Sequence, residues 1–371
     1  MLNASRWRCD ALIVRAGGID VVELAGLTTD SVARRAHVFV KASQRAERAY
    51  QHLSDPSLLG NGLDAIQARH VAGQQYQTEM SRFEATLLDT MEWLWDELAG
   101  PVLAALRIDR PPAAGDVERP RVWWCPTGLL TLFPIHAAGH HRSGMDGSGR
   151  SVQDLVVSSY TPTLDALRRA RDGAAAAAAT MLVVAQADTP AQARLSNAER
   201  VRDLLTDAFS GRCTVLEGAA ATTAAVSAQM HHHDWVHFSC HGDQMWSDPF
   251  SGGLELHDGM LTIASISARR HRGEFAFLAA CKTAVGGLAA PDEAITLATA
   301  LHYSGYRHVI GTLWLVADPI VADVAQGVYG DIAAGARTAD RAAYALYDAI
   351  QQLRRRGLSV PYWAPFTHTG P

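Results

Sequence analysis

Two short apolar runs each end on a side chain that can take part in catalysis. Residues 236–243 (VHFSCHGD) place His241 before a glycine, and residues 275–283 (FAFLAACKT) place Cys281 forty positions later. Short apolar runs bounded by polar or glycine residues are typical of buried parallel strands. Ligands bind beyond the carboxyl ends of such strands, so we expect both side chains in one crevice. A histidine facing a cysteine is the minimum apparatus for a thiol nucleophile, which predicts a cysteine protease.

The predicted chemistry assigns a role to each residue of this pair. Cys281 must be a thiolate to attack a carbonyl carbon, and a neighbouring imidazolium lowers a thiol's pKa. His241 supplies that charge and then protonates the leaving amine. The backbone N–H groups of Gly242 and Cys281 are the candidate oxyanion donors, because glycine allows close approach of the backbone to substrate. A lone Cys281 would more often be a small buried core residue, and only the matching His241-Gly242 strand end favours catalysis.

Neighbouring residues that could compete for a catalytic role have simpler explanations. Asp243 either orients His241 or faces solvent, so we predict no triad. Cys240 points to the opposite sheet face from its neighbour His241 and is expected in the core. Cys125 lies next to a proline–glycine turn and has no better claim to catalysis. Consecutive histidines at 231–233 cannot readily converge on one ion, which favours a solvated helix end over a metal site.

The elements that must position the pair alternate between strand and helix. We expect strands at 121–125, 130–135, 181–185 and 213–216, at the two runs above and at 308–315, with hairpins at 11–24 and 254–263. We expect helices at 29–53, 76–106, 197–209, 223–230, 293–303, 320–334 and 338–356. This alternation predicts an α/β fold with a mostly parallel sheet sandwiched by helices, preceded by a mainly helical N-terminal segment. The expected domains are residues 1–118 and 119–371.

Composition excludes several classes of protein. The 371 residues are 48% hydrophobic and 19% charged, which is enough to build a substantial core. A net charge of -5 gives no electrostatic footprint for direct binding to nucleic acid. No apolar stretch reaches the length of a membrane span, and residues 1–8 lack the apolar core of a secretory signal. Five scattered cysteines fit a reducing compartment, so we expect a cytoplasmic protein.

These residues resemble the motifs of a known family. The pair His241-Gly242 followed by 279–283 (AACKT) looks like the catalytic dyad of CHAT domains, caspase-like proteases related to separase. Further segments that agree with the family pattern are 123–128 (WWCPTG), 158–163 (SSYTPT), 311–318 (GTLWLVAD) and 362–366 (YWAPF). The resemblance covers about residues 121–370. One departure is Lys282, where family members often carry an acidic residue.

The resemblance implies a caspase-type fold and hydrolysis of peptide bonds in a protein substrate, without a metal or organic cofactor. It also implies a role in bacterial defence, cell death or signalling, with an activating protein or sensor as partner. Because the chain carries no sensor of its own, we expect either a separate activator or a fragment of a longer chain. In separase-like relatives an acid at the place of Asp318 reads a basic residue before the scissile bond. Asp318-Pro319 also precedes an expected helix, so Asp318 is equally well an N-cap.

Three alternatives to a constitutive protease stay open. The domain could be a catalytically silent scaffold or signalling module, which Lys282 favours, or a zymogen whose dyad is separated until an activator binds. A flavodoxin-like regulatory or nucleotide-binding domain follows from the strand–helix alternation alone. It explains neither His241-Gly242 nor Cys281, and we rank it last.

Overall fold

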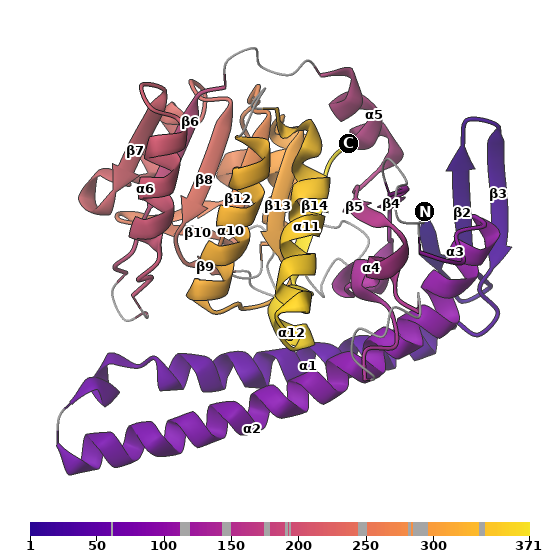
Figure 1. Ribbon diagram of the computed structural model, residues 1–371, viewed down its shortest axis with the longest axis horizontal. Helices are drawn as coiled ribbons and strands as arrows, with labels where there is room; N and C mark the ends of the chain where they lie inside the picture. Colours follow the sequence, from indigo (N-terminus) through magenta and orange to yellow (C-terminus); the bar gives the residue numbers. More distant parts are fainter. Residues whose placement is uncertain are drawn as a thin grey trace.

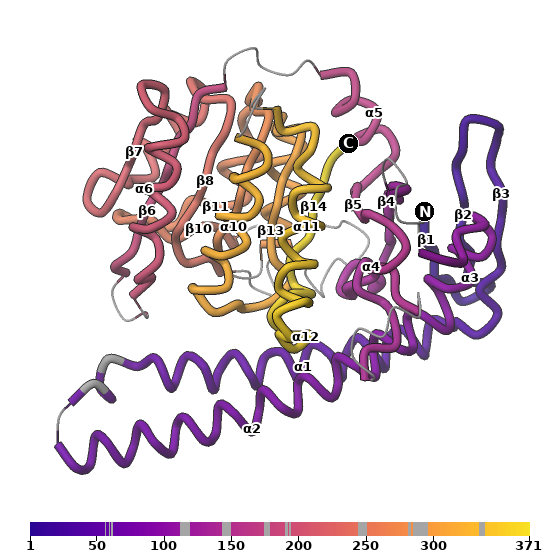
Figure 2. The backbone as a smooth tube through the Cα atoms, viewed as in Figure 1, coloured from indigo at the N-terminus to yellow at the C-terminus, as the bar shows by residue number. Residues whose placement is uncertain are grey.

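The computed structural model has an eight-stranded sheet covered by helices, with a long helical hairpin along one end of it (Figures 1 and 2). The structure describes residues 1–60, 62–111, 119–142, 150–173, 179–189, 192, 194–243, 251–280, 283–284, 296–333 and 338–371. Cys281 and Lys282 lie outside the described residues, as do most of the 140–149 and 243–253 loops.

The central sheet is mostly parallel. Its strand order is β4-β5-β14-β13-β12-β8-β6-β7. The strands are β4 (Arg121–Trp124), β5 (Val157–Tyr160), β6 (Met181–Ala185), β7 (Cys213–Glu217), β8 (Trp235–Ser239), β12 (Phe275–Ala279), β13 (His308–Thr312) and β14 (Phe366–Thr369). Strands β13, β12, β8, β6 and β7 run parallel to one another, and the only antiparallel pairing among the described strands of this sheet joins β13 to β14. The predicted α/β class is confirmed.

Alternate residues of the central strands feed two separate cores. On β12, Phe275 and Phe277 lie in one hydrophobic cluster, whereas Ala276 and Leu278 lie in the other. This period of two is the geometry of a strand buried on both faces, which explains why the run carries no polar residue. The sheet is therefore a rigid platform whose strand ends hold loop residues in place.

Helices cover both faces of the sheet. The first face packs against α6 (Ala198–Ala208), α10 (Asp318–Ile332) and α11 (Ala342–Arg355), which lie in front of the sheet in Figure 1. The second face packs against α7 (Thr223–Gln229), α8 (Ile263–Ser267), α9 (Leu297–Ser304) and the hairpin of β10 (Gly253–Leu256) and β11 (Gly259–Thr262). The short helices α4 (Val152–Leu155) and α5 (Leu164–Asp172) flank β5, and α12 (Val360–Trp363) leads into β14.

The N-terminal segment combines a small sheet with a helical hairpin. The small sheet comprises β1 (Leu2–Ala4), β2 (Cys9–Arg15) and β3 (Gly18–Glu23), and its β2–β3 hairpin agrees with the prediction. Helix α1 (Thr29–Leu53) begins where expected, because Thr28 and Ser31 form a reciprocal capping box. Helix α2 (Leu63–Leu94) begins thirteen residues before the predicted start at 76, and its path continues through a π-helical turn (Trp95–Ala99) into α3 (Gly100–Ala105).

Aromatic side chains join this hairpin to the sheet domain. Phe39 of α1 lies with its ring centroid 5.9 Å from those of Phe83, Phe133 and Trp314. Trp314 follows β13, so the hairpin packs directly on the end of the central sheet. The hairpin and the sheet share one hydrophobic cluster.

The predicted strand at 130–135 is wrong. That segment forms 3-10 turns at Gly128–Leu132 and Ile135–Ala137. Its apolar residues are buried all round, with Leu130 and Ile135 both 0% exposed, so the apolar run carried no periodicity that could separate a strand from a turn. Strands β5 and β14 were not predicted either, and β14 lies between β13 and β5 in the sheet.

Among the residues that the structure describes, no helix combines the length and apolarity needed to cross a membrane.

Candidate active site

His241 lies just beyond the carboxyl end of β8. The strand ends at Ser239, and after His241 the chain forms the short strand β9 (Gly242–Asp243), which pairs antiparallel with β10. The N–H of Glu255 on β10 donates to the carbonyl oxygen of His241 at 2.9 Å. His241 is thus held between two strands and is partly exposed at the mouth of a cleft.

The register of the sheet relates His241 to the predicted nucleophile. Ala279 on β12 pairs with Ser239 on β8, and both strands end at that pair. His241 and Cys281 each come two positions later in the sequence. Cys281 is outside the described residues, so its relation to His241 is inferred from the Ser239–Ala279 register.

The backbone N–H of Gly242 points away from β10. In this antiparallel ladder Gly253 pairs with Asp243 and Leu254 with Gly242. Because Glu255 donates to His241, the Gly242–Leu254 pair is one of the non-hydrogen-bonded pairs, which alternate with bonded ones. The Gly242 N–H is therefore not consumed by the ladder, as an oxyanion donor requires.

Contacts from the end of β13 hold the chain on both sides of position 281. The Thr312 hydroxyl donates to the carbonyl oxygen of Ala280 at 2.9 Å. The Thr312 N–H donates to Oγ1 of Thr283 at 2.9 Å, and the Ala284 N–H donates to the Thr312 carbonyl oxygen at 2.9 Å. Thr283 is 1% exposed, so these bonds are shielded from water.

The cleft at these strand ends has a volume of about 590 Å³ and is lined by carboxylates. Glu47, Asp243, Glu255 and Asp318 all contribute to its wall, and no arginine or lysine among the described residues does. Glu47, Tyr50 and Gln51 come from α1, and Ser54 is the C-cap of that helix. The N-terminal hairpin is thus part of the cleft, and the cleft suits a cationic group.

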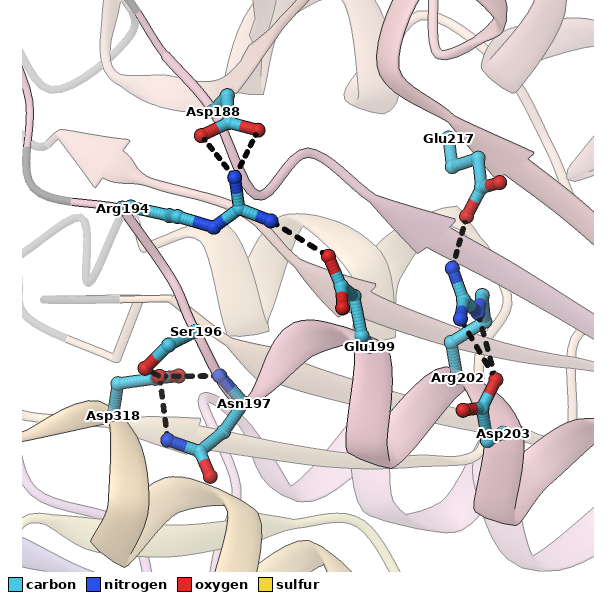
Figure 3. A network of polar contacts seen from close by, with 9 residues as sticks. All are labelled: Asp188, Arg194, Ser196, Asn197, Glu199, Arg202, Asp203, Glu217 and Asp318. Atoms are coloured by element: carbon cyan, nitrogen blue, oxygen red, sulfur yellow. Dashed lines mark hydrogen bonds and ion pairs between the residues drawn. The ribbon is translucent and has the colours of Figure 1, made fainter.

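Asp318 is fixed by the segment that opens α6 (Figure 3). Its Oδ2 accepts from the backbone N–H of Asn197 at 2.8 Å, from Nδ2 of Asn197 at 2.9 Å and from the Ser196 hydroxyl at 3.5 Å. The alternative role as N-cap of its own helix is wrong, because Ala317 is the N-cap and Asp318 is the first residue of α10. No described residue donates a hydrogen bond to Oδ1. One carboxylate oxygen therefore anchors the side chain and the other is available at the cleft wall.

The other cysteines show no features of a nucleophile. Cys240 is 1% exposed and lies in the core, as expected. Burial raises the pKa of Cys125, and it also raises the pKa of Cys213. Both thiols are therefore less ionised than an ordinary cysteine.

The three consecutive histidines at 231–233 do not share one set of partners. His233 contacts the Gln229 carbonyl oxygen and the Thr214 hydroxyl, at 2.8 and 2.9 Å, whereas His231 stacks on His271. Among the described histidines, cysteines and carboxylates, no three come together as a metal site would require.

Two groups of cleft residues were missed by the sequence analysis. The hairpin that carries Glu255 was predicted from the His257-Asp258-Gly259 turn, but only the structure pairs its first strand with the segment after His241. Glu47 and Tyr50 have no such signal, since their spacing on α1 is that of an ordinary amphipathic helix. Only the packing of the hairpin brings them to the cleft.

Comparisons with known proteins place the chain in a family. Residues 88–371 match the CHAT domain family. Comparison with curated protein sequences finds no match. Among solved structures, the chain is similar to the Arg-specific cysteine proteinase gingipain R, with a TM-score of 0.40 and 10% identity over 59% of this chain and 55% of that one. It is also similar to a complex of the pro- and mature domains of that enzyme from Porphyromonas gingivalis, with a TM-score of 0.46 and 9% identity over 77% and 68% of the two chains.

A third similar structure is the Saccharomyces cerevisiae separase–securin complex, with a TM-score of 0.48 and 9% identity over 93% of this chain and 27% of that one. The chain therefore spans about half the length of the first of these proteins and about a quarter of the separase chain. The family match extends over most of the chain, from α2 through the whole central sheet. By that match, the chain belongs to the CHAT domain family.

Proposed function

We propose that this chain is a caspase-like cysteine endopeptidase that cleaves a protein substrate with Cys281 as nucleophile. The observation that carries the proposal is the Ser239–Ala279 register at the end of β8 and β12. It supports a location for Cys281 beside His241, at the mouth of a cleft large enough for a peptide side chain.

In the proposed reaction His241 accepts the thiol proton and Cys281 attacks the scissile carbonyl carbon. The oxyanion is stabilised by the N–H groups of Gly242 and Cys281. His241 then donates the proton to the leaving amine, and a thioester remains on Cys281. Water attacks that thioester with His241 as base, which releases the acid product and regenerates the thiol.

We further propose cleavage after arginine or lysine, with Asp318 as the residue that binds the basic side chain. The four carboxylates of the cleft supply a field that favours a cation. The anchored geometry of Asp318 supports a charge-assisted bond from a guanidinium to the remaining oxygen. On family resemblance, we also propose that the protein is located in the cytoplasm and that it acts in bacterial defence or cell death. The same resemblance suggests that an activating protein controls it.

The test of catalysis uses a fluorogenic peptide panel and three proteins: wild type, Cys281→Ala and Cys240→Ala. We expect turnover by wild type and Cys240→Ala and none by Cys281→Ala, since Cys240 is a buried core residue directly after β8. Turnover that survives in Cys281→Ala would contradict the proposal. If wild type shows no turnover and Cys281→Ala still binds the partner protein, the domain is instead a silent scaffold.

The test of specificity compares arginine and leucine peptides with Asp318→Asn. A hydrogen bond to a charged group contributes about 1.5–3 kcal/mol, so kcat/KM for arginine should fall about 10- to 100-fold. The value for leucine should change little. Asp203→Asn, an exposed acid on α6, is the matched control. A preference for leucine or aspartate by wild type would refute the assignment of Asp318.

A further inference from the structure

The hydroxyl of Thr312 contacts the chain directly before the proposed nucleophile. Thr312 is the last residue of β13, which lies next to β12 in the sheet. Its hydroxyl donates to the carbonyl oxygen of Ala280, the residue after β12, at 2.9 Å. Thr312 is 1% exposed and Ala280 is 6% exposed, so water does not readily replace this donor. The Ala280 carbonyl group is therefore held facing β13.

The same hydrogen bond sets the direction of the next N–H group of the chain. The Ala280 carbonyl and the N–H of residue 281 belong to one peptide unit, which is planar and trans, so the two bonds point in opposite directions. With the oxygen directed at β13, we expect the N–H to be directed at the other neighbour of β12, which is β8. His241 and Gly242 follow β8. The N–H is thus aimed at the side of the proposed base and of the other oxyanion donor.

The Thr312 hydroxyl also makes this N–H a stronger donor. A hydrogen bond to the carbonyl oxygen draws electron density through the amide, and successive hydrogen bonds polarise one another. Because Thr312 is buried, this effect operates at a low local dielectric, where hydrogen bonds are electrostatically stronger than in water. The hydroxyl therefore acts on both the direction and the strength of the N–H.

Thr312 is itself held in place by several bonds. Its N–H donates to Oγ1 of Thr283, and its carbonyl oxygen accepts from the Ala284 N–H, both at 2.9 Å. On its other side it pairs with Phe366 of β14. A β-branched side chain also has few rotamers, which keeps the hydroxyl in one direction. The donor is therefore in position before any reaction begins, as electrostatic stabilisation of a transition state requires.

We infer that Thr312 is a positioning residue of the oxyanion hole, an inference that rests on the proposed cysteine protease function. Through the Ala280 carbonyl group, it aims the N–H of Cys281 at the oxygen on which negative charge develops. The second donor is the N–H of Gly242, which the β9–β10 ladder does not use. Thr312 acts through this peptide unit and touches neither the substrate nor the thiol. Its removal should therefore slow steps that form an oxyanion and leave the reactivity of the thiol unchanged.

The test compares Thr312→Val with wild type in two reactions of the same cysteine. The first is hydrolysis of the fluorogenic peptide that wild type cleaves best. The second is alkylation of Cys281 by iodoacetamide, with Cys281→Ala as blank, in which sulfur displaces iodide and no oxyanion forms. Valine has the shape of threonine without the donor, so we expect kcat to fall about 10- to 100-fold with little change in KM. The alkylation rate should stay within about twofold of wild type, because it depends on the thiolate alone.

Two controls separate the hydroxyl from its surroundings. Thr312→Ser keeps the donor and should restore kcat to near the wild-type value. Thr367→Val is the matched control on β14, because Thr367 is 4% exposed and its hydroxyl donates to the Gly311 carbonyl oxygen at 3.4 Å. This change removes a buried hydroxyl beside β13 without touching the contacts of Thr312, so kcat should equal that of wild type. Thr312→Ala is a second variant without the donor, for use if valine prevents folding, and the same difference between the two reactions is expected.

Three outcomes would overturn the inference while wild type still turns over, and so leave the proposed function intact. They are an unchanged kcat in Thr312→Val, a loss that Thr312→Ser does not restore, and equal losses of kcat and of alkylation rate. Equal losses would show that the thiol itself is displaced, which is a purely structural effect. Wild type without turnover on any peptide would refute the proposed function and this inference together.

Discussion

The hydroxyl of Thr283 is the acceptor that ties the chain after position 281 to the end of β13. Its Oγ1 receives the N–H of Thr312 at 2.9 Å, and the side chain is 1% exposed. Thr283→Val keeps the shape of the side chain and removes the acceptor. The Thr312 N–H is then left buried without a partner, which costs about 1–3 kcal/mol of unfolding free energy.

Thr283→Ser provides the opposite control. Serine keeps the acceptor and removes one methyl group, so we expect a loss of about 0.8 kcal/mol from reduced apolar burial. The two variants separate the hydrogen bond from packing. If the proposed function holds, Thr283→Val should also reduce kcat about 10- to 100-fold, because small displacements of a nucleophile are costly, whereas Thr283→Ser should stay within severalfold of wild type.

A double-mutant cycle with Gly311 tests the same contact from the other side. A Cβ placed on Gly311 would lie 2.8 Å from Oγ1 of Thr283. Gly311→Ala should therefore be destabilising alone and less so in a Thr283→Ala background. For residues in direct contact we expect a coupling energy of about 0.5–3 kcal/mol.

Urea unfolding followed by circular dichroism measures all of these free energies and does not need activity. The reasoning is refuted if Thr283→Val is as stable as wild type, since the Thr312 N–H would then have another partner. Additive effects of Gly311→Ala and Thr283→Ala would equally show that the two side chains do not touch.

Three further predictions concern other parts of the fold. Burial lowers the pKa of His136 to about 4, of His237 to about 3 and of His308 to about 4. Below about pH 6.5 the unfolded chain binds protons at these histidines, whereas the folded chain does not. The contribution of these histidines to the free energy of unfolding is therefore complete above that pH. It falls toward pH 4, by up to about 1.4 kcal/mol per pH unit for each group. Urea midpoints that do not change between pH 7 and pH 5 would contradict this. Phe39→Ala should lose about 3–5 kcal/mol in thermal unfolding, and a loss below 1 kcal/mol would show that the hairpin is not anchored there. Gly305→Ala should lower the unfolding temperature, because the φ of Gly305 is +126° and a Cβ there would lie 2.0 Å from a backbone carbonyl oxygen. An unchanged unfolding temperature would argue against this geometry.

The strands that carry the active-site segments were predictable because their sequence pattern favours one type of secondary structure. A run such as 275–280 has no polar residue and is bounded by turn signals, a combination typical of a short strand buried on both faces. The turn signals that bound each run predict the strand ends, and the alternation with helices predicts that the strands are parallel. The position of His241 just beyond β8 follows from local pattern alone, and the same pattern predicts residue 281 beyond β12.

The apolar run at 130–135 shows where this reasoning fails. Every apolar residue of such a segment is buried whether it forms a strand or a 3-10 turn, so composition does not distinguish the two. Strand β14 is short and its place between β13 and β5 depends on partners far away in the sequence. Long-range pairing of this kind leaves no local signal.

The fold class, the ends of the two active-site strands and the candidate pair were therefore predictable, since each depends on a pattern within a few residues. Tertiary structure decided what surrounds them. It brought Glu47 of α1 into the cleft, it turned Asp318 toward the start of α6, and it placed the Thr312 hydroxyl on the carbonyl oxygen before position 281. The physical reason is that a side chain's partners are set by the packing of elements distant in sequence, which local pattern does not encode.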